Sequence, residues 1–141
     1  MASLDDAWES LRAAETHLRS LNYSGAIREA QICVELSIKA LLENFNIEYK
    51  KAHDIGDGVF SGVSQKAFPY VKDYEIKHFA ECLAKSRIYL KLLSSIKNFT
   101  TYTFLGVPAK RLFDKDFATI IVGYARDTYW CCKHLSDKIV I

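Results

Sequence analysis

The sequence lacks any apolar run long enough to cross a membrane. Plain apolar runs such as Ile120, Ile121 and Val122 fall far short of the ~20 residues that a spanning helix needs. The first six residues, MASLDD, also lack the basic region and the apolar core of a secretory signal. We therefore expect a soluble, cytoplasmic protein.

The sequence also lacks an excess of charge of one sign. Its 141 residues hold 19 Lys and Arg against 17 Asp and Glu, a formal net charge of +2, which indicates no class of partner by itself. Half of the residues are hydrophobic and 13% are aromatic, so the chain can build a core. This length fits one domain that covers residues 1–141.

Cysteines are few, and they do not form the framework of a small disulfide-rich protein. Cys33 and Cys82 fall within apolar helical patterns, where a free thiol packs as a small hydrophobe. Cys131 and Cys132, followed by His134, raise the question of a metal. Zinc ligands are usually separated by two to four residues, and adjacent helical side chains point about 100° apart. We therefore expect four reduced cysteines in a reducing compartment and no metal site.

Apolar residues recur every three or four positions in four long segments, which predicts helices. We expect an all-α, up-and-down helical bundle of four long helices plus one short helix, with no internal repeat. The expected inward residues are Leu4, Trp8, Leu11, Ala14, Leu18 and Leu21; Ala26, Ala30, Cys33, Val34, Ser37, Ala40, Leu41 and Phe45; Ile55, Val59, Phe60 and Val63; Ile76, Phe79, Ala80, Leu83, Leu90, Leu93 and Ile96; and Phe117, Ile120, Ile121, Tyr124, Thr128, Cys131 and Leu135.

Capping and turn residues separate these segments. Residues 22–25 (NYSG) offer caps between the first two helices, and residues 44–46 (NFN) end the second. Asp54 and Asp114 are placed as N-caps of the short helix and of the last helix. We expect a loop over residues 64–69, the fourth segment from Asp73 to near Asn98, and an ordered loop over residues 100–108.

Acidic residues are absent from positions 82–113, a stretch that carries six basic residues. Arg87, Lys91 and Ser94 would form one stripe on a helix, and aromatic residues lie between the basic positions. Basic groups beside aromatic rings suit phosphate contact and base stacking. The alternative is a solvated helix face above an aromatic core. The six basic residues are Lys85, Arg87, Lys91, Lys97, Lys110 and Arg111.

Four segments together resemble the HEPN (higher eukaryotes and prokaryotes nucleotide-binding) family. They are YSGAIREAQ at 23–31, VELSIKALL at 34–42, HDIG at 53–56 and LFDKDFA at 112–118. The resemblance implies a compact helical bundle that is usually a dimer. It also implies either a partnership with a minimal nucleotidyltransferase in a prokaryotic toxin–antitoxin module, or a ribonuclease with an Arg-x(4–6)-His motif.

That ribonuclease motif is not found on the expected helix. Arg12 and His17 have the right spacing but lie on the first helix, and Arg126 and His134 are separated by seven residues. Thr101 stands before Tyr102 where related members carry an arginine. The resemblance therefore supports the fold and predicts no catalytic residue.

The sequence leaves three functions open. The first is a non-catalytic, dimeric HEPN protein that binds a nucleotide or RNA phosphate, or a nucleotidyltransferase partner, without a cofactor. The second is a metal-independent ribonuclease with a displaced Arg/His site, and the third is a helical adaptor without a small ligand. The candidate ligand-binding residues are Lys39, Lys51, His53, Arg87 and Lys91.

Some of these candidates also have a purely structural interpretation. Lys51 suits the C-terminal end of the second helix, where the helix dipole favours a positive charge. His53 could hydrogen-bond a backbone group, and Glu35 could neutralise Lys39 one helical turn away.

Overall fold

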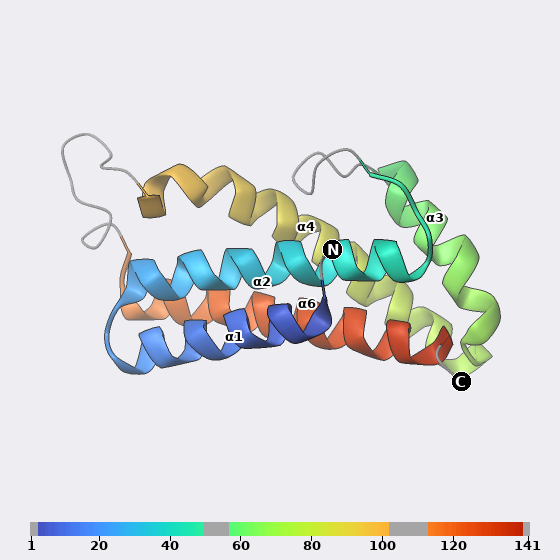
Figure 1. The fold of residues 1–141 in the computed structure, drawn as a ribbon, viewed down its shortest axis with the longest axis horizontal. Helices are drawn as coiled ribbons and strands as arrows, with labels where there is room; N and C mark the ends of the chain where they lie inside the picture. Colours follow the sequence, from blue (N-terminus) through green and yellow to red (C-terminus); the bar gives the residue numbers. More distant parts are fainter. Residues whose placement is uncertain (1–2, 50–56, 102–112, 140–141) are drawn as a thin grey trace.

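The computed structural model describes residues 3–49, 57–101 and 113–139 (Figure 1). All regular structure in these ranges is helical, which confirms the predicted all-α bundle of four long helices and one short helix. The elements are α1 (Leu4–Arg19), α2 (Tyr23–Asn44), α3 (Asp57–Ala67), the 3-10 helix η2 (Phe68–Tyr70), α4 (Asp73–Thr101) and α6 (Lys115–Ile139).

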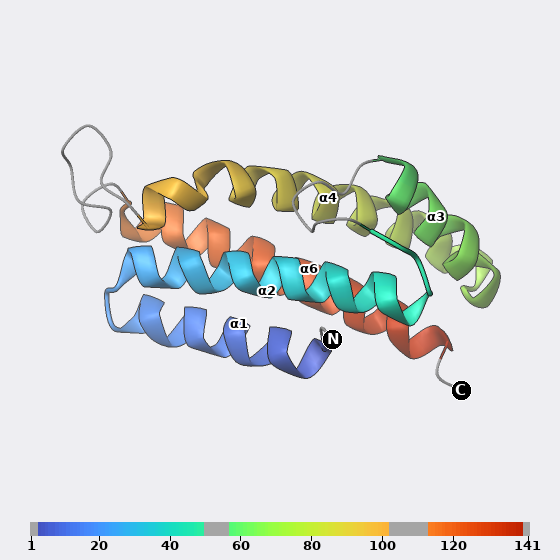
Figure 2. The same ribbon diagram turned by 45° about the horizontal axis from the view of Figure 1, so that its top comes forward.

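The four long helices run in alternating directions along the bundle (Figures 1 and 2). Helices α2 and α6 each pack against the other three long helices, whereas α1 and α4 lie on opposite sides of this central pair. Helix α3 lies at one end of the bundle, beside the first half of α4. In the described parts of the chain, no helix is both long enough and apolar enough to cross a membrane.

Side-chain caps fix the beginnings of two long helices at the predicted positions. The Asn22 side-chain oxygen accepts a hydrogen bond from the Gly25 backbone N–H at 3.1 Å, at the start of α2. The Asp114 carboxylate accepts one from the Phe117 N–H at 2.8 Å, at the start of α6. Each cap satisfies a backbone donor that has no partner within its helix. The predicted cap at Asp54 lies outside the described residues.

The core is built on the small inward face of α2, and all eight residues predicted for this face are buried. Small side chains such as Ala26, Ala30 and Ser37 allow neighbouring helices to approach α2 closely. Among the inward residues predicted for the other helices, three were wrong, because Leu21, Ala80 and Ile120 are exposed. Leu21 has a φ of 63° between α1 and α2, and the other two lie just beside the buried stripe. Ile55 lies outside the described residues.

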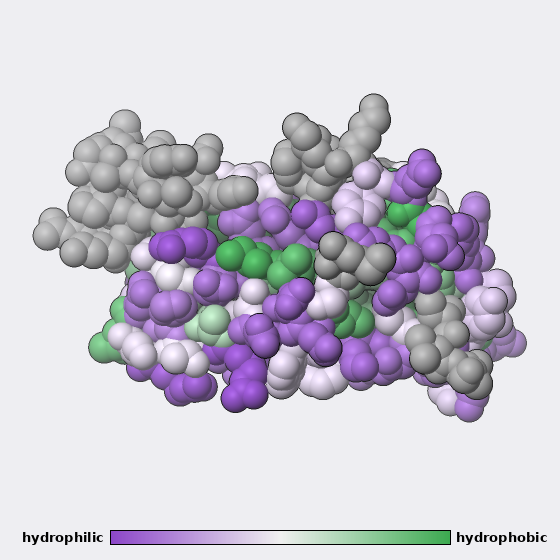
Figure 3. All heavy atoms as spheres, in the orientation of Figure 1, coloured by the Kyte–Doolittle hydropathy of each residue, from purple (hydrophilic) through white to green (hydrophobic). Residues whose placement is uncertain are grey.

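Hydrophilic residues predominate on the face of the molecule over α1 and α2, with small apolar patches among them (Figure 3). Apolar residues scattered singly on a surface are normal for folded proteins.

The predicted loop at residues 64–69 was wrong. Helix α3 continues to Ala67, which is buried, and η2 follows at once. Within α3, the Ser64 hydroxyl donates to the Phe60 carbonyl one turn earlier, at 3.2 Å. Pro69 lies in the first turn of η2, where its missing N–H costs no hydrogen bond. Helix α4 extends to Thr101, slightly beyond the predicted end, so the prediction of a loop over residues 100–108 was wrong for residues 100 and 101. The rest of that predicted loop lies outside the described residues.

The prediction of four reduced cysteines was wrong for one pair. Cys82 of α4 and Cys131 of α6 form a disulfide, with their Cα atoms 6.0 Å apart. Periodicity places each cysteine on an inward face, but it does not indicate which helix lies opposite. Cys33 and Cys132 are free and buried, as expected for packing residues. Burial raises the pKa of the Cys33 thiol to about 12 and raises that of Cys132 as well.

Candidate binding site between α4 and α6

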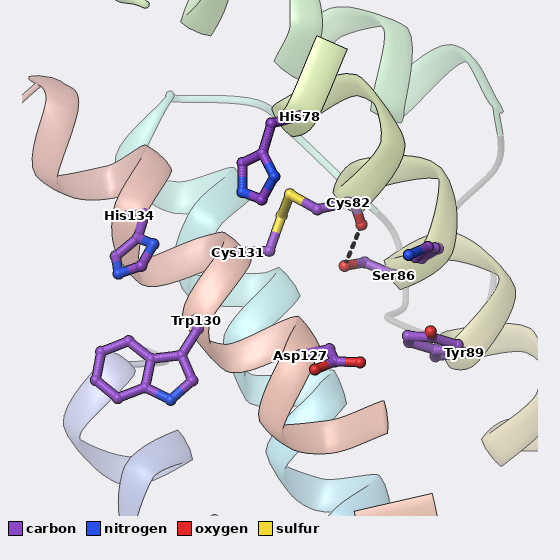
Figure 4. Close-up of a pocket in the computed structure, with 9 residues that line it drawn as sticks. His78, Cys82, Ser86, Tyr89, Asp127, Trp130, Cys131 and His134 are labelled. Carbon is purple, nitrogen blue, oxygen red and sulfur yellow. Dashed lines mark hydrogen bonds between the residues drawn. A yellow bond between two sulfur atoms is a disulfide. The ribbon is translucent and has the colours of Figure 1, made fainter. Parts of the chain in front are cut away.

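A pocket of about 300 Å³ lies between α4 and α6 (Figure 4). Its volume is at the lower end of the range for small-molecule sites in proteins. Its lining combines two imidazoles, an ammonium group, a carboxylate and two large aromatic rings. These side chains are His78, Lys85 and Tyr89 from α4 and Asp127, Trp130 and His134 from α6.

Helical spacing places these side chains together. On α4, positions 78, 82, 85 and 89 recur every three or four residues and therefore share one face. On α6, positions 127, 130, 131 and 134 do the same. The antiparallel packing of α4 against α6 then brings the two faces opposite each other.

The disulfide links the two walls of this pocket. Cys82 and Cys131 both line it, and Figure 4 shows their bond crossing the gap between the helices. Below the disulfide, the buried Ser86 hydroxyl donates to the Cys82 carbonyl at 2.8 Å, which satisfies a polar group that cannot reach water. The covalent bond therefore fixes the spacing of α4 and α6 at the pocket.

Aromatic rings lie on both walls of the pocket, Tyr89 on α4 and Trp130 on α6. Trp130 is 41% exposed, and its ring meets those of Trp8 and Tyr129 in edge-type contacts. Its ring centroid lies 5.8 Å from that of Trp8 and 5.5 Å from the imidazole of His134. Tyr89 is stacked on Tyr124 at 4.1 Å. Burial raises the pKa of the Tyr89 hydroxyl, and the negative charge of Asp127 adds to this effect.

A second hollow, of about 270 Å³, adjoins the pocket and shares both of its histidines. The Lys138 ammonium donates to the Glu75 carboxylate at 3.1 Å in this hollow, which joins α6 to the start of α4. This hydrogen bond lowers the pKa of Glu75. Asp137 also lines the hollow and pairs with Lys133 at 3.0 Å.

The residues predicted from sequence lie elsewhere. Arg87 is on α4 but lines a different hollow, of about 280 Å³, together with Phe60 and Ser61 of α3. Lys91 is exposed one turn further along α4, so these two members of the predicted stripe share a helix face, whereas the hydroxyl of its third member, Ser94, is buried. Lys39 is partly buried on α2.

The remaining site predictions have separate outcomes. Lys51 and His53 lie outside the described residues. The ion pair expected between Glu35 and Lys39 is replaced by a hydrogen bond from Gln31 Nε2 to Glu35 at 3.3 Å.

Three of the four residues considered for a displaced ribonuclease site have different neighbours. His17 Nδ1 lies 3.1 Å from the Asn22 side-chain nitrogen, at the end of α1. Arg126 reaches toward α1, where its guanidinium lies 3.6 Å from Glu15. His134, in contrast, borders the pocket between α4 and α6. Within one chain, His17, Arg126 and His134 therefore belong to different environments.

Sequence reasoning missed the residues of the α4–α6 pocket. The recurring spacing of His78, Cys82, Lys85 and Tyr89 marks one helix face, and this signal was available. The spacing did not show which helix would lie opposite this face of α4, because each helix presents several faces and only the packing of the bundle determines which faces meet.

The comparison with known families agrees with this architecture. The family model of the HEPN domain matches residues 1–133. Neither a curated protein nor a solved structure matches the chain significantly. The match covers nearly the whole chain, including all four long helices up to the last turns of α6. The chain therefore belongs to the HEPN domain family, whose functions concern nucleotides and RNA.

Proposed function

We propose that the protein binds a nucleotide, or the phosphates of a short RNA segment, in the α4–α6 pocket without cleaving it. One observation carries this proposal. The exposed Lys85 ammonium, two imidazoles and the exposed Trp130 ring border a single hollow of about 300 Å³. Membership of the HEPN family supports the same class of ligand.

Each group in the pocket has a role in this proposal. Lys85 supplies positive charge for a phosphate, and the exposed imidazoles of His78 and His134 add hydrogen-bond donors. Trp130 offers a ring on which a base can stack, an interaction worth ~1–3 kcal/mol per base. Asp127 offers an acceptor for an exocyclic amine or a ribose hydroxyl.

Arg87 and Lys91 provide a second cationic face on α4, beyond the pocket. We propose that a longer RNA strand continues onto this face, whereas a mononucleotide does not use it. Lys39, Lys51 and His53 stay predictions of ligand contact from the sequence.

The partner assignment rests on the family resemblance. We propose a cytoplasmic homodimer that acts beside a minimal nucleotidyltransferase in a prokaryotic toxin–antitoxin module. The separation of Arg126 from His134 supports a non-catalytic role in such a module. Size measurement in solution, followed by co-purification with a nucleotidyltransferase from the neighbouring gene, tests this part of the proposal.

A binding titration tests the ligand site. We expect a fluorescent RNA oligonucleotide to bind the wild type with an affinity that falls steeply as salt rises. Lys85→Ala should weaken binding at least about tenfold, because a hydrogen bond to a charged group contributes ~1.5–3 kcal/mol. Lys77→Ala is the matched control, since Lys77 is also exposed on α4 but does not line the pocket. Equal losses in both variants would refute the assignment of the site.

One observation favours a second function, metal-independent RNA cleavage. His78 and His134 border the same hollow, so one imidazole could accept the proton of a ribose 2′-hydroxyl while the other protonates the leaving oxygen. RNA cleavage in the presence of a chelator, lost in His78→Ala and in His134→Ala but kept in His17→Ala, would establish this function in place of simple binding.

A further inference from the structure

Two helices place a histidine and a cysteine at the spacing of paired metal ligands. His78 and Cys82 are four residues apart on α4, and Cys131 and His134 are three residues apart on α6. Residues three or four apart share a helix face. Both pairs line the same pocket, and the two cysteines lie opposite each other with a Cα–Cα distance of 6.0 Å. Two sulfur and two imidazole groups therefore surround one gap between the helices.

The disulfide form does not use this set as a metal site. Among the side chains that the structure describes, no three His, Cys, Asp or Glu groups are arranged to hold a metal ion. The two sulfur atoms are bonded to each other, so neither is available as a thiolate, the form of cysteine that binds metals.

We propose that reduction of the Cys82–Cys131 disulfide creates a tetrahedral Zn²⁺ site formed by His78, Cys82, Cys131 and His134. Two cysteine thiolates and two neutral imidazoles are a common donor set for structural zinc. The site shares His78 and His134 with the proposed nucleotide pocket, but neither Lys85 nor Trp130 belongs to it.

The chemistry balances in two steps. A phosphine reductant attacks the disulfide, and with one water molecule this gives two thiols and one phosphine oxide, so the phosphine supplies both electrons. Zn²⁺ then replaces the protons of the two thiols and binds the lone pairs of two neutral imidazoles, with release of two protons. An oxidant that accepts two electrons restores the disulfide and releases the metal.

Figure 4 shows which ligands are already aligned. The His78 ring projects from α4 toward α6, beside the disulfide. The His134 ring is turned toward Trp130, so it must rotate about its side-chain bonds to face the two sulfurs. His134 is exposed, so this rotation breaks only the contact with Trp130 among the interactions described for it.

Neighbouring groups fit this assignment. The carboxylates of Glu75 and Asp137, which pair with Lys138 and Lys133, line the adjoining hollow together with both histidines. Carboxylates near metal-bound imidazoles commonly accept the second ring N–H and so orient the ligand. Cys132 is not part of the set, because it points about 100° away from Cys131 around the helix and is fully buried.

Cobalt binding tests the proposal on the full chain. We expect the phosphine-reduced protein to bind one equivalent of Co²⁺, with the visible bands of a tetrahedral site and a near-ultraviolet thiolate-to-cobalt charge-transfer band. Zn²⁺ should displace the cobalt and remove both signals. The disulfide-bonded protein should give neither signal.

Ligand variants locate the site. His78→Ala and His134→Ala should each weaken Co²⁺ binding at least tenfold, and Cys82→Ser should reduce the charge-transfer band. His17→Ala, outside the pocket, should leave binding unchanged. If Cys82→Ser fails to fold, the variants of the two exposed histidines, His78 and His134, still test the proposal. The proposal is wrong if reduced wild type gives no tetrahedral cobalt spectrum, if the His78→Ala/His134→Ala double variant binds as the wild type does, or if the oxidised protein binds equally well.

Discussion

The disulfide between α4 and α6 gives the most quantitative prediction about stability. Cys82 and Cys131 are 49 residues apart in sequence, so their bond closes a long loop in the unfolded chain. The chain-entropy relation gives a loss of roughly 14 cal/mol/K for a loop of this length, or about 4 kcal/mol at 25 °C. We therefore expect the variant with Cys82→Ala and Cys131→Ala to lose about 4 kcal/mol of unfolding free energy.

Urea denaturation measures this loss directly. Far-ultraviolet circular dichroism follows the helices, and the free energy of unfolding is extrapolated to water. For a domain of this size, the same loss corresponds to a fall in Tm of roughly 12 °C, at about 3 °C per kcal/mol. Both proteins are measured with a chelator, so that metal cannot restabilise the reduced chain.

A reductant provides the matched control. It should lower the stability of the wild type to near that of the double variant, and it should leave the double variant unchanged. A thiol assay on the denatured, non-reduced wild type should find two free thiols, those of Cys33 and Cys132. Four free thiols, together with a wild type that is insensitive to the reductant, would refute the reasoning.

Two further predictions concern single residues. Gly123→Ala should stabilise the protein by up to ~1 kcal/mol in thermal unfolding, because an added Cβ meets open space in the middle of α6. Gly25→Ala should give no such gain, because its Cβ would lie 2.5 Å from the Asn22 side chain that caps α2. The hydrogen bond from Lys138 lowers the pKa of Glu75 in the folded state, so this pair stabilises the folded protein at neutral pH. The stabilisation is lost as the pH falls below about 4.3, the ordinary pKa of a glutamate. The stability difference between wild type and Glu75→Gln should therefore shrink between pH 6 and pH 3, and a constant difference would contradict the role of the pair.

The fold was predictable because local signals and periodicity agree along this chain. The eight residues predicted for the inward face of the second helix recur at helical spacing and are buried, and Asn22 and Asp114 cap the helices that they precede. One error arose where tertiary packing outweighs a local signal. Helix α3 continues to Ala67, which is buried in the core, through a segment whose residues resemble a loop.

The candidate site was less predictable because it depends on which helix faces meet. Arg87 and Lys91 were recognised as a stripe from their spacing alone, and the structure keeps that stripe. The pocket instead forms only if the helix face that carries His78 lies opposite the face that carries His134. These two residues are more than 50 positions apart in the sequence. The same long-range pairing joins Cys82 to Cys131, which no pattern within one helix could reveal.

The central claim is that the α4–α6 pocket is where the ligand binds. The most direct test follows the imidazole NMR signals of the disulfide-bonded protein during titration with a short RNA oligonucleotide. We expect the signals of His78 and His134 to shift with one common affinity, while that of His17, at the end of α1, stays in place. Saturable binding that leaves both pocket histidines unshifted would contradict the claim.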